Sequence, residues 1–484
     1  MLRYLFANIS PLQTLTKNSF WIVFGRVAAG VLRAGLTILA ARTLGVAGFG
    51  SFTLAMNFVL IFSFLPEFGF TAILTRELAK RQGDPHRTFS ALFSLTLVCS
   101  LIAYALLILI SPLAIRDPRA LAVVPILGIM MLLDVLREFT YGVFRAEERM
   151  QIQGIQHTLT NLLLFGLGAA ILTLNPSLPL LAIAYLTAVG AGAIIGVIAA
   201  RRYFSHITLS FDPSVIRHFF TAAWPIALAN FLFLLLLYLD SVILGWFHPP
   251  AIVGLYGATV KFTEFLIFFP QAIALAVFPM FSRSLNDPVQ LRRYLELSLR
   301  LGFLLTVPIA AGGFVLGGTI VPFIFGPAYA AAAPAFRIIV ISLLGTAPFL
   351  ILTNLLVALD QRRDLLRFDF ALVVINAVAN LLTVPHFHYY AAAYNTVLTS
   401  LLGLVFAHHI SRRHVSYALE PLAAKPLGAA ILMGLLLWPL RGLTPLLTVP
   451  LGVLIYLFAL IISREEVTTK VITILRFRPR FLPL

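Results

Sequence analysis

Long, uninterrupted apolar stretches fill most of the chain, and short polar segments separate them. Each stretch is close to the roughly 20 residues that an α-helix needs to cross a bilayer. The sequence therefore predicts fourteen membrane-spanning helices. They are expected at about residues 19–43, 51–74, 89–111, 120–141, 154–174, 178–200, 219–246, 251–281, 297–321, 335–358, 368–385, 389–410, 425–440 and 443–463.

The apolar stretches are continuous and do not alternate with polar positions. Residues 231–237, for example, read Phe-Leu-Phe-Leu-Leu-Leu-Leu, whereas strands of a membrane barrel are about 10 residues long and alternate. The predicted fold class is therefore an all-α polytopic membrane protein. The first stretch carries Arg26 and Arg33, which the short apolar region of a signal peptide would not tolerate, so we expect a retained span.

Composition supports this class and removes others. Of the 484 residues, 60% are hydrophobic and 11% are charged, against about 45–50% and 25% in soluble domains. The single cysteine, Cys99, lies in an apolar stretch and cannot form an intrachain disulfide. The sequence holds no phosphate-cradling loop, nucleophile elbow or metalloprotease motif, so it predicts no cofactor, no metal site and no enzymatic activity.

The placement of the basic residues explains the formal net charge of +16. Of the 35 Lys and Arg residues, 27 fall in the termini, in every second connecting loop or at the span ends beside these loops, and three fall in the alternate loops. Since cytoplasmic loops are enriched in Lys and Arg, both termini are predicted to lie in the cytoplasm, in a multi-pass protein of the cell membrane. The basic loops are expected to contact anionic membrane lipids, and nucleic acid is not an expected partner.

An internal repeat relates the two halves of the chain at an offset of 204 residues. The matched pairs are Gly50 with Gly254, Phe52 with Tyr256, Phe58 with Phe262, and Pro66 with Pro270. Six predicted helices separate the copies, so both copies start on the same side and the repeat is parallel, with its pseudo-axis along the membrane normal. We expect two pseudo-symmetric six-helix bundles around a central cavity, residues 1–212 and 213–412. Residues 413–484 are expected to add two helices and a cytoplasmic tail.

Four short motifs follow one another in the order and spacing of a known family. They are Leu44-Gly45-Val46-Ala47-Gly48-Phe49-Gly50, Val253-Gly254-Leu255-Tyr256-Gly257-Ala258 with Lys261, Phe278-Pro279-Met280-Phe281-Ser282-Arg283, and Phe325-Gly326-Pro327-Ala328-Tyr329-Ala330. With these motifs the chain resembles the polysaccharide-biosynthesis flippases, the Wzx-like branch of the multidrug/oligosaccharidyl-lipid/polysaccharide exporter superfamily. Val46 departs from the proline often found there. The resemblance implies alternating-access export of a lipid-linked saccharide to the outer leaflet, without ATP hydrolysis, with polysaccharide-assembly proteins as candidate partners.

Three basic residues within the spans are the candidate substrate ligands. Arg26 and Arg33 are seven residues apart and share one helix face, and Lys261 lies in the eighth predicted helix. Charged groups in apolar spans need a partner or a water-filled cavity. We expect these cations to bind the diphosphate of a polyprenyl-linked saccharide, because guanidinium groups bind phosphate oxygens bidentately. The alternative is that they form salt bridges with acidic residues of the spans.

Those acidic residues, and two prolines, complete the candidate set. Glu67, Asp240 and Glu264 are either charge partners or sites for a coupling proton or sodium ion. Lys261 and Glu264 are three residues apart and can pair within one helix. Pro66 and Pro270 remove backbone donors inside predicted helices and are candidate hinges, with helix packing as the alternative explanation.

Two further functions stay open on the sequence alone. An ion-coupled drug or organic-ion antiporter of the same superfamily would favour an acidic cavity for cationic substrates, which Arg26 and Arg33 disfavour. A membrane-embedded glycan transferase or polymerase usually needs a sizeable outer loop, and outer loops such as 44–50 and 385–388 are predicted to be short. A flippase for lipid II is close to the leading prediction, and the motifs do not separate the two.

Overall fold

The computed structural model describes residues 8–80, 84–203 and 209–465, and these residues contain helices and no strand. The helices are α2 (Pro11–Phe62), α3 (Phe64–Glu67), α4 (Phe70–Ala79), α5 (Pro85–Ala114), α6 (Pro118–Ala146), α7 (Met150–Leu174), α8 (Leu178–Ala200), α9 (Pro213–Phe247), α10 (Pro250–Arg283), α11 (Pro288–Phe325), η1 (Pro327–Ala332), α12 (Ala333–Ile339), η2 (Val340–Ser342), α13 (Leu343–Ala358), α14 (Arg362–Arg412), α15 (Glu420–Leu437), η3 (Trp438–Leu440) and α16 (Pro445–Ile462). The predicted all-α class is confirmed.

Twelve helical stretches of the described residues are long and apolar enough to cross a membrane. Two of them contain more residues than one crossing needs, since α2 has 52 residues and α14 has 51, or roughly 75–80 Å at about 1.5 Å per residue. The helical path breaks at Gly45 (φ 68°, ψ 174°) in α2 and at His388 (φ 54°, ψ −143°) in α14. The loops expected at 44–50 and 385–388 are thus reduced to sharp breaks. The count of fourteen spans stays a prediction.

Several helices begin with the same two-residue signal, a capping side chain followed by proline. Asp117, for example, accepts hydrogen bonds from the backbone N–H groups of Arg119 and Ala120, and Pro118 follows it. Such a side chain satisfies donors that the first helical turn leaves free, and proline at that position has no donor to lose. The same arrangement starts α2 at Ser10, α5 at Asp84 and α11 at Asp287.

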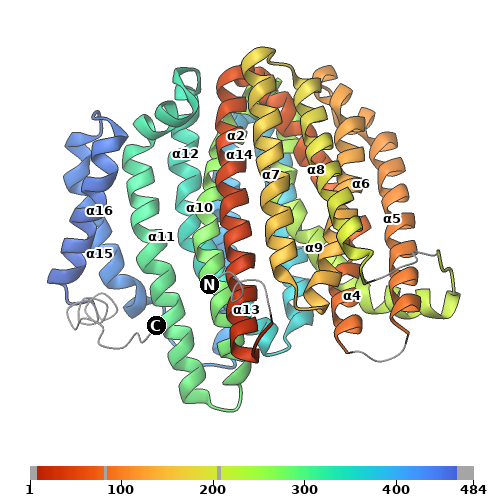
Figure 1. The fold of residues 1–484 in the computed structure, drawn as a ribbon. Coiled ribbons are helices and arrows are strands. Elements are labelled where there is room, and N and C mark those ends of the chain that lie inside the picture. The colour runs from red at the N-terminus through yellow and green to blue at the C-terminus, as the bar shows by residue number, and fades with distance from the viewer. Residues whose placement is uncertain (1–7, 81–83, 204–208, 466–484) are drawn as a thin grey trace. The chain divides into compact units, whose positions relative to one another are not determined.

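The chain divides into two compact units, Met1–Gly257 and Ala258–Leu484. In the first unit, α7 packs against both α2 and α8, and α6 packs against α8 (Figure 1). A core of buried aromatic and aliphatic side chains, among them Phe70, Leu92 and Phe139, joins α4, α5 and α6. The lobe boundaries at 212 and 412 stay a prediction, and the tail predicted beyond residue 465 lies outside the described residues.

In the second unit, α15 and α16 lie side by side (Figure 1) and both pack on α11. Tyr456 of α16 donates a hydrogen bond to the carbonyl oxygen of Leu304 in α11, at 3.1 Å. The two halves of α14 are joined by buried amides, because the Asn395 side chain donates to Asn380 Oδ1 at 3.1 Å. Side-chain hydrogen bonds of this kind hold membrane helices together where hydrophobicity alone gives no preference.

Within the first unit, the start of α10 packs closely on the second half of α2. A Cβ atom on Gly50 would overlap the carbonyl oxygen of Pro250, and one on Gly254 would overlap the carbonyl oxygen of Val46. An offset of 204 residues relates Gly50 to Gly254 and Val46 to Pro250. The two overlaps are therefore equivalent, and equivalent positions of the repeat face one another. The contact is therefore symmetric under the 204-residue offset, which supports the predicted repeat.

Candidate functional site

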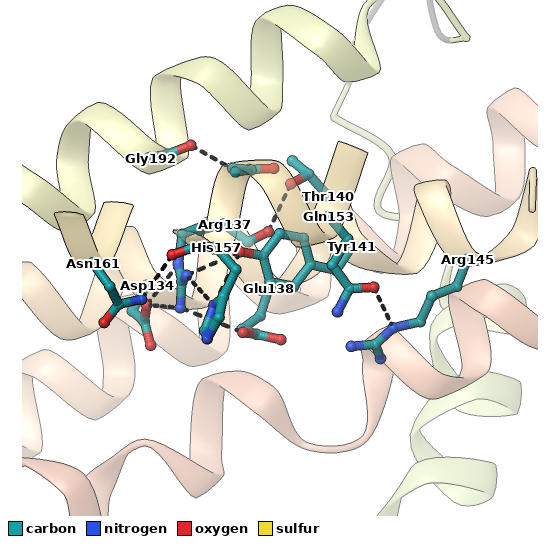
Figure 2. Close-up of polar contacts among 11 residues, drawn as sticks. Asp134, Arg137, Glu138, Thr140, Tyr141, Arg145, Gln153, His157, Asn161 and Gly192 are labelled. Carbon is teal, nitrogen blue, oxygen red and sulfur yellow. Dashed lines mark hydrogen bonds and ion pairs between the residues drawn. The ribbon is translucent and has the colours of Figure 1, made fainter. Parts of the chain in front are cut away.

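A stripe of polar side chains follows one face of α6. Asp134, Arg137, Glu138, Tyr141 and Arg145 occupy positions i, i+3, i+4, i+7 and i+11, the spacing that places residues on one side of an α-helix. Gln153 and His157 of α7 face this stripe (Figure 2). These seven residues are called the α6–α7 polar cluster below.

Arg137 is the centre of the α6–α7 polar cluster, and its side chain is 7% exposed. Its Nε and Nη2 atoms lie 2.9 and 2.6 Å from Asp134 Oδ1, and Nη2 also lies 3.4 Å from Glu138 Oε1. Nη1 donates to the Tyr141 hydroxyl at 2.9 Å and lies 3.1 Å from His157 Nδ1 (Figure 2). An arginine has five N–H donors; four of them make these hydrogen bonds, and Nη2 also forms an ion pair with Asp134. Arg137 is therefore a structural centre that is almost completely bonded within the cluster.

The Arg137 contact also selects the state of His157. A guanidinium can only donate, so the Nδ1 atom 3.1 Å away accepts the hydrogen bond. The His157 ring is consequently in the tautomer that carries its proton on Nε2. The Asn161 side chain donates to the His157 carbonyl oxygen at 2.8 Å and completes the α7 side.

Arg145 closes the other end of the α6–α7 polar cluster. Its Nε atom donates to Gln153 Oε1 at 3.0 Å (Figure 2). Arg145 interacts electrostatically with Glu138 and with Arg26 of α2. Arg145 is thus a partly bonded arginine near Arg26, in contrast to the extensively bonded Arg137.

The structure brings Arg26 and Arg33 to the α6–α7 polar cluster. Both side chains belong to exposed residues on α2, and both interact electrostatically with His157. Arg26 also acts on Glu138. Neither arginine forms an ion pair with any residue in the described part of the chain, and Arg33 makes only a 3.4 Å hydrogen bond to the Ala29 carbonyl of its own helix. The salt bridges weighed as the alternative are absent among these residues.

The acidic candidates fall in separate environments. Glu67 ends the short helix α3 and acts electrostatically on Glu138 and Asp134, so it belongs with the carboxylates near the α6–α7 polar cluster. Asp240 of α9 is buried and accepts a hydrogen bond from the Tyr256 hydroxyl at 3.0 Å. No group of three His, Cys, Asp or Glu side chains in the described residues is placed to hold a metal ion.

Lys261 and Glu264 belong to the second unit, in α10. Lys261 Nζ lies 3.0 Å from Glu264 Oε2 and 3.2 Å from Oε1, which confirms the expected pairing within one helix. Both side chains are about a quarter exposed. The charge of Lys261 is therefore balanced locally, unlike the charges of Arg26 and Arg33.

The two candidate hinge prolines differ in their surroundings. Pro66 is buried in α3, and positive φ values at Phe68 (29°) and Gly69 (78°) break the path before α4. Pro270 lies inside α10, which continues without a break to Arg283. Only Pro66 therefore lies beside an interruption of the helical path, and a hinge at either proline stays a prediction.

The α6–α7 polar cluster was not among the residues predicted from sequence to form the site. The stripe of Asp134, Arg137, Glu138, Tyr141 and Arg145 is visible in the sequence as polar positions three and four apart in an apolar helix. The partner helix is harder to predict, because Gln153 and His157 become relevant only when α7 is known to lie against α6.

Comparison with solved structures defines the class first. The fold is similar to that of the lipid II flippase MurJ in an inward closed conformation, with a TM-score of 0.77, 13% identity, and coverage of 92% of this chain and 100% of that one. A multidrug resistance MATE family transporter of the MOP superfamily, in an inward-facing conformation, matches with a TM-score of 0.67, 13% identity, and coverage of 82% and 96%. The fold is thus that of a polytopic helical transporter.

Comparison with known sequences then gives the family. The sequence pattern of the family described as "Polysaccharide biosynthesis protein" matches residues 15–285, and the MatE pattern matches residues 225–382. The chain belongs to the polysaccharide biosynthesis protein family, as the resemblance predicted. It is 26% identical to the probable flippase AglR of Haloferax volcanii, covering 77% of this chain and 78% of that protein. It is 23% identical to a putative O-antigen transporter of Shigella flexneri, covering 69% and 81%.

Proposed function

We propose that this multi-pass membrane protein is a flippase that moves a polyprenyl-diphosphate-linked oligosaccharide from the cytoplasmic to the outer leaflet. The observation that carries the proposal is the pair Arg26 and Arg33, two exposed arginines on one face of α2 without an ion-pair partner in the described residues. The similarity to the probable flippase AglR and to a putative O-antigen transporter supports the same class of cargo.

The chemistry of the first unit suits an anionic headgroup. Arg137 is buried and bonded within the cluster, so the cations available to a ligand are Arg26, Arg33 and the remaining donors of Arg145. Planar guanidinium groups bind phosphate oxygens through paired hydrogen bonds and stay charged at every physiological pH. A diphosphate that approaches α2 would meet three guanidinium groups, with Glu138 as a nearby carboxylate that interacts electrostatically with Arg26 and Arg145.

The remaining roles follow from this assignment. Lys261 is paired with Glu264. It would bind the diphosphate only after this ion pair breaks, and it is the proposed substrate-binding cation of the second unit. Glu67 and Asp240 are the proposed groups for charge balance or ion coupling. The proposed orientation has both termini in the cytoplasm, and the proposed transport needs no chemical catalysis. Polysaccharide-assembly proteins are the proposed protein partners.

Flipping by purified protein in vesicles tests the proposal directly. The substrate is a fluorescent polyprenyl-diphosphate oligosaccharide, and a membrane-impermeant quencher measures how much of it reaches the outer leaflet. The double variant Arg26→Ala/Arg33→Ala is expected to lower the initial rate about 100-fold or more, because it removes two charged hydrogen bonds that contribute about 1.5–3 kcal/mol each. The matched control is Arg116→Ala/Arg119→Ala, which removes the same charge from exposed positions in the α5–α6 connection and the first turn of α6.

The controls separate the two outcomes. The control variant is expected to flip the substrate at the wild-type rate. Equal rates for wild type and the α2 double variant would show that Arg26 and Arg33 do not belong to the substrate site. A wild-type protein that flips no lipid-linked saccharide but exchanges an organic cation for protons or sodium would replace the flippase with an antiporter.

A further inference from the structure

An apolar groove of about 510 Å³ runs between α7 and α8. The α7 wall includes Leu159, Leu163 and Gly166, and the α8 wall includes Ala188, Ala191 and Ile195. The volume falls in the range of about 300–1,000 Å³ that is typical of ligand sites. The groove therefore has the dimensions and the lining of a site for an apolar ligand.

The groove opens on an exposed apolar surface of the first unit. Leu159, Leu163 and Ile195 are 46%, 39% and 44% exposed, and an exposed apolar surface on membrane spans suits contact with the hydrocarbon chains of the bilayer. The groove residues lie near the middle of α7 (Met150–Leu174) and of α8 (Leu178–Ala200). At this depth the surroundings are hydrocarbon chains, because headgroups lie at the ends of the spans.

The floor of the groove separates the bilayer from the α6–α7 polar cluster. A Cβ atom on Gly192 would overlap the Thr160 hydroxyl and would lie 3.2 Å from Cδ of Arg137. Thr160 is 5% exposed, and its hydroxyl oxygen accepts no hydrogen bond from the described residues. The Arg137 network thus lies directly beneath a thin floor of small side chains.

We infer that this groove is a binding site for one acyl chain of a bilayer phospholipid, which fills the space between α7 and α8 and shields the Arg137 network. An unbranched methylene chain fits a trough whose walls include Gly and Ala and which carries no charged lining residue. The chain would gain dispersion contacts that an empty groove lacks. A bound lipid adds to the stability of the folded protein by mass action.

A glycine in the groove allows a test that leaves the rest of the fold intact. A Cβ atom on Gly166 would meet no heavy atom within 4 Å, so Gly166→Phe would place its ring in the groove. The matched control is Gly428→Phe on α15, where a Cβ atom also meets nothing within 4 Å. Ala191→Leu fills the groove from the α8 wall and is the second variant if Gly166→Phe does not fold.

The measurement compares delipidated full-length proteins in detergent, with and without added dipalmitoyl phosphatidylglycerol. Added dipalmitoyl phosphatidylglycerol is expected to raise the melting temperature of wild type and of Gly428→Phe. In Gly166→Phe this rise is expected to be lost. Native mass spectrometry is expected to detect one fewer retained phospholipid in Gly166→Phe than in wild type.

Two results would overturn the inference. One is an equal rise in melting temperature and equal lipid retention for Gly166→Phe and wild type. The other is that a polyprenyl phosphate, whose chain is methyl-branched, stabilises wild type at a lower concentration than phosphatidylglycerol and loses this effect in Gly166→Phe. In that case the groove would hold the isoprenoid chain and not an acyl chain.

Discussion

At the scale of single residues, the arginines of the first unit divide by what their donors contact. Arg137 makes four hydrogen bonds, to Asp134, Glu138, Tyr141 and His157, and an ion pair with Asp134. Arg26 has no ion pair among the described residues, although it interacts electrostatically with Glu138. Burial and extensive bonding make Arg137 a structural residue, whereas exposure leaves Arg26 available to a ligand.

The structural role of Arg137 gives a stability prediction. Arg137→Met is expected to lower the free energy of unfolding by about 2–4 kcal/mol, because it leaves Asp134 without its partner. Breaking a fully buried pair costs about 3–5 kcal/mol. The expected cost is smaller here because Asp134 is 36% exposed. The double variant Asp134→Asn/Arg137→Met is expected to recover part of this loss, with a coupling energy of about 0.5–3 kcal/mol. Thermal unfolding in detergent measures both. Additive losses from the two single variants would contradict the account.

At the scale of elements, the closest helix contact in the repeat depends on two glycines. Gly50 and Gly254 each leave room for a carbonyl oxygen of the facing segment. Small residues of this kind let membrane helices approach until their backbones touch. Because the two positions are equivalent under the 204-residue offset, a substitution at either one creates the same overlap.

Gly50→Ala and Gly254→Ala are therefore expected to lower the melting temperature by similar amounts, each costing about 1–3 kcal/mol as overpacking does. Gly428→Ala, on an exposed face of α15, is the control and is expected to leave the melting temperature unchanged. Differential scanning fluorimetry of the three variants makes the comparison. A large effect at one glycine and none at the other would contradict a symmetric contact.

The sequence predicted the elements more completely than the site. Apolar runs of bilayer length located the spans, because the membrane requires every backbone group to be satisfied within a helix. The same pattern did not predict that α2 and α14 are continuous helices. Where loops were expected, each helix has a break at one residue, Gly45 in α2 and His388 in α14. The helical spacing placed Arg26 and Arg33 on one face, but it could not show that α7 brings His157 to Arg137.

At the scale of the whole molecule, fold and family point to transport. The chain shares its fold with helical transporters and belongs to the polysaccharide biosynthesis protein family. The fold alone does not predict the charge of the cargo, since one fold can serve different functions. The position of charges within the first unit does bear on it. Two available arginines on α2 favour an anionic lipid-linked cargo over an organic cation.

The most direct test of this account is mass spectrometry of polyprenyl-linked glycans in cells that lack the chain. A complete diphosphate-linked oligosaccharide is expected to accumulate in these cells. Wild-type protein is expected to clear it, and Arg26→Ala/Arg33→Ala, expressed at the same level, is expected to leave it in place. An unchanged pool of lipid-linked glycan in the cells without the chain, together with altered drug susceptibility, would contradict the flippase account.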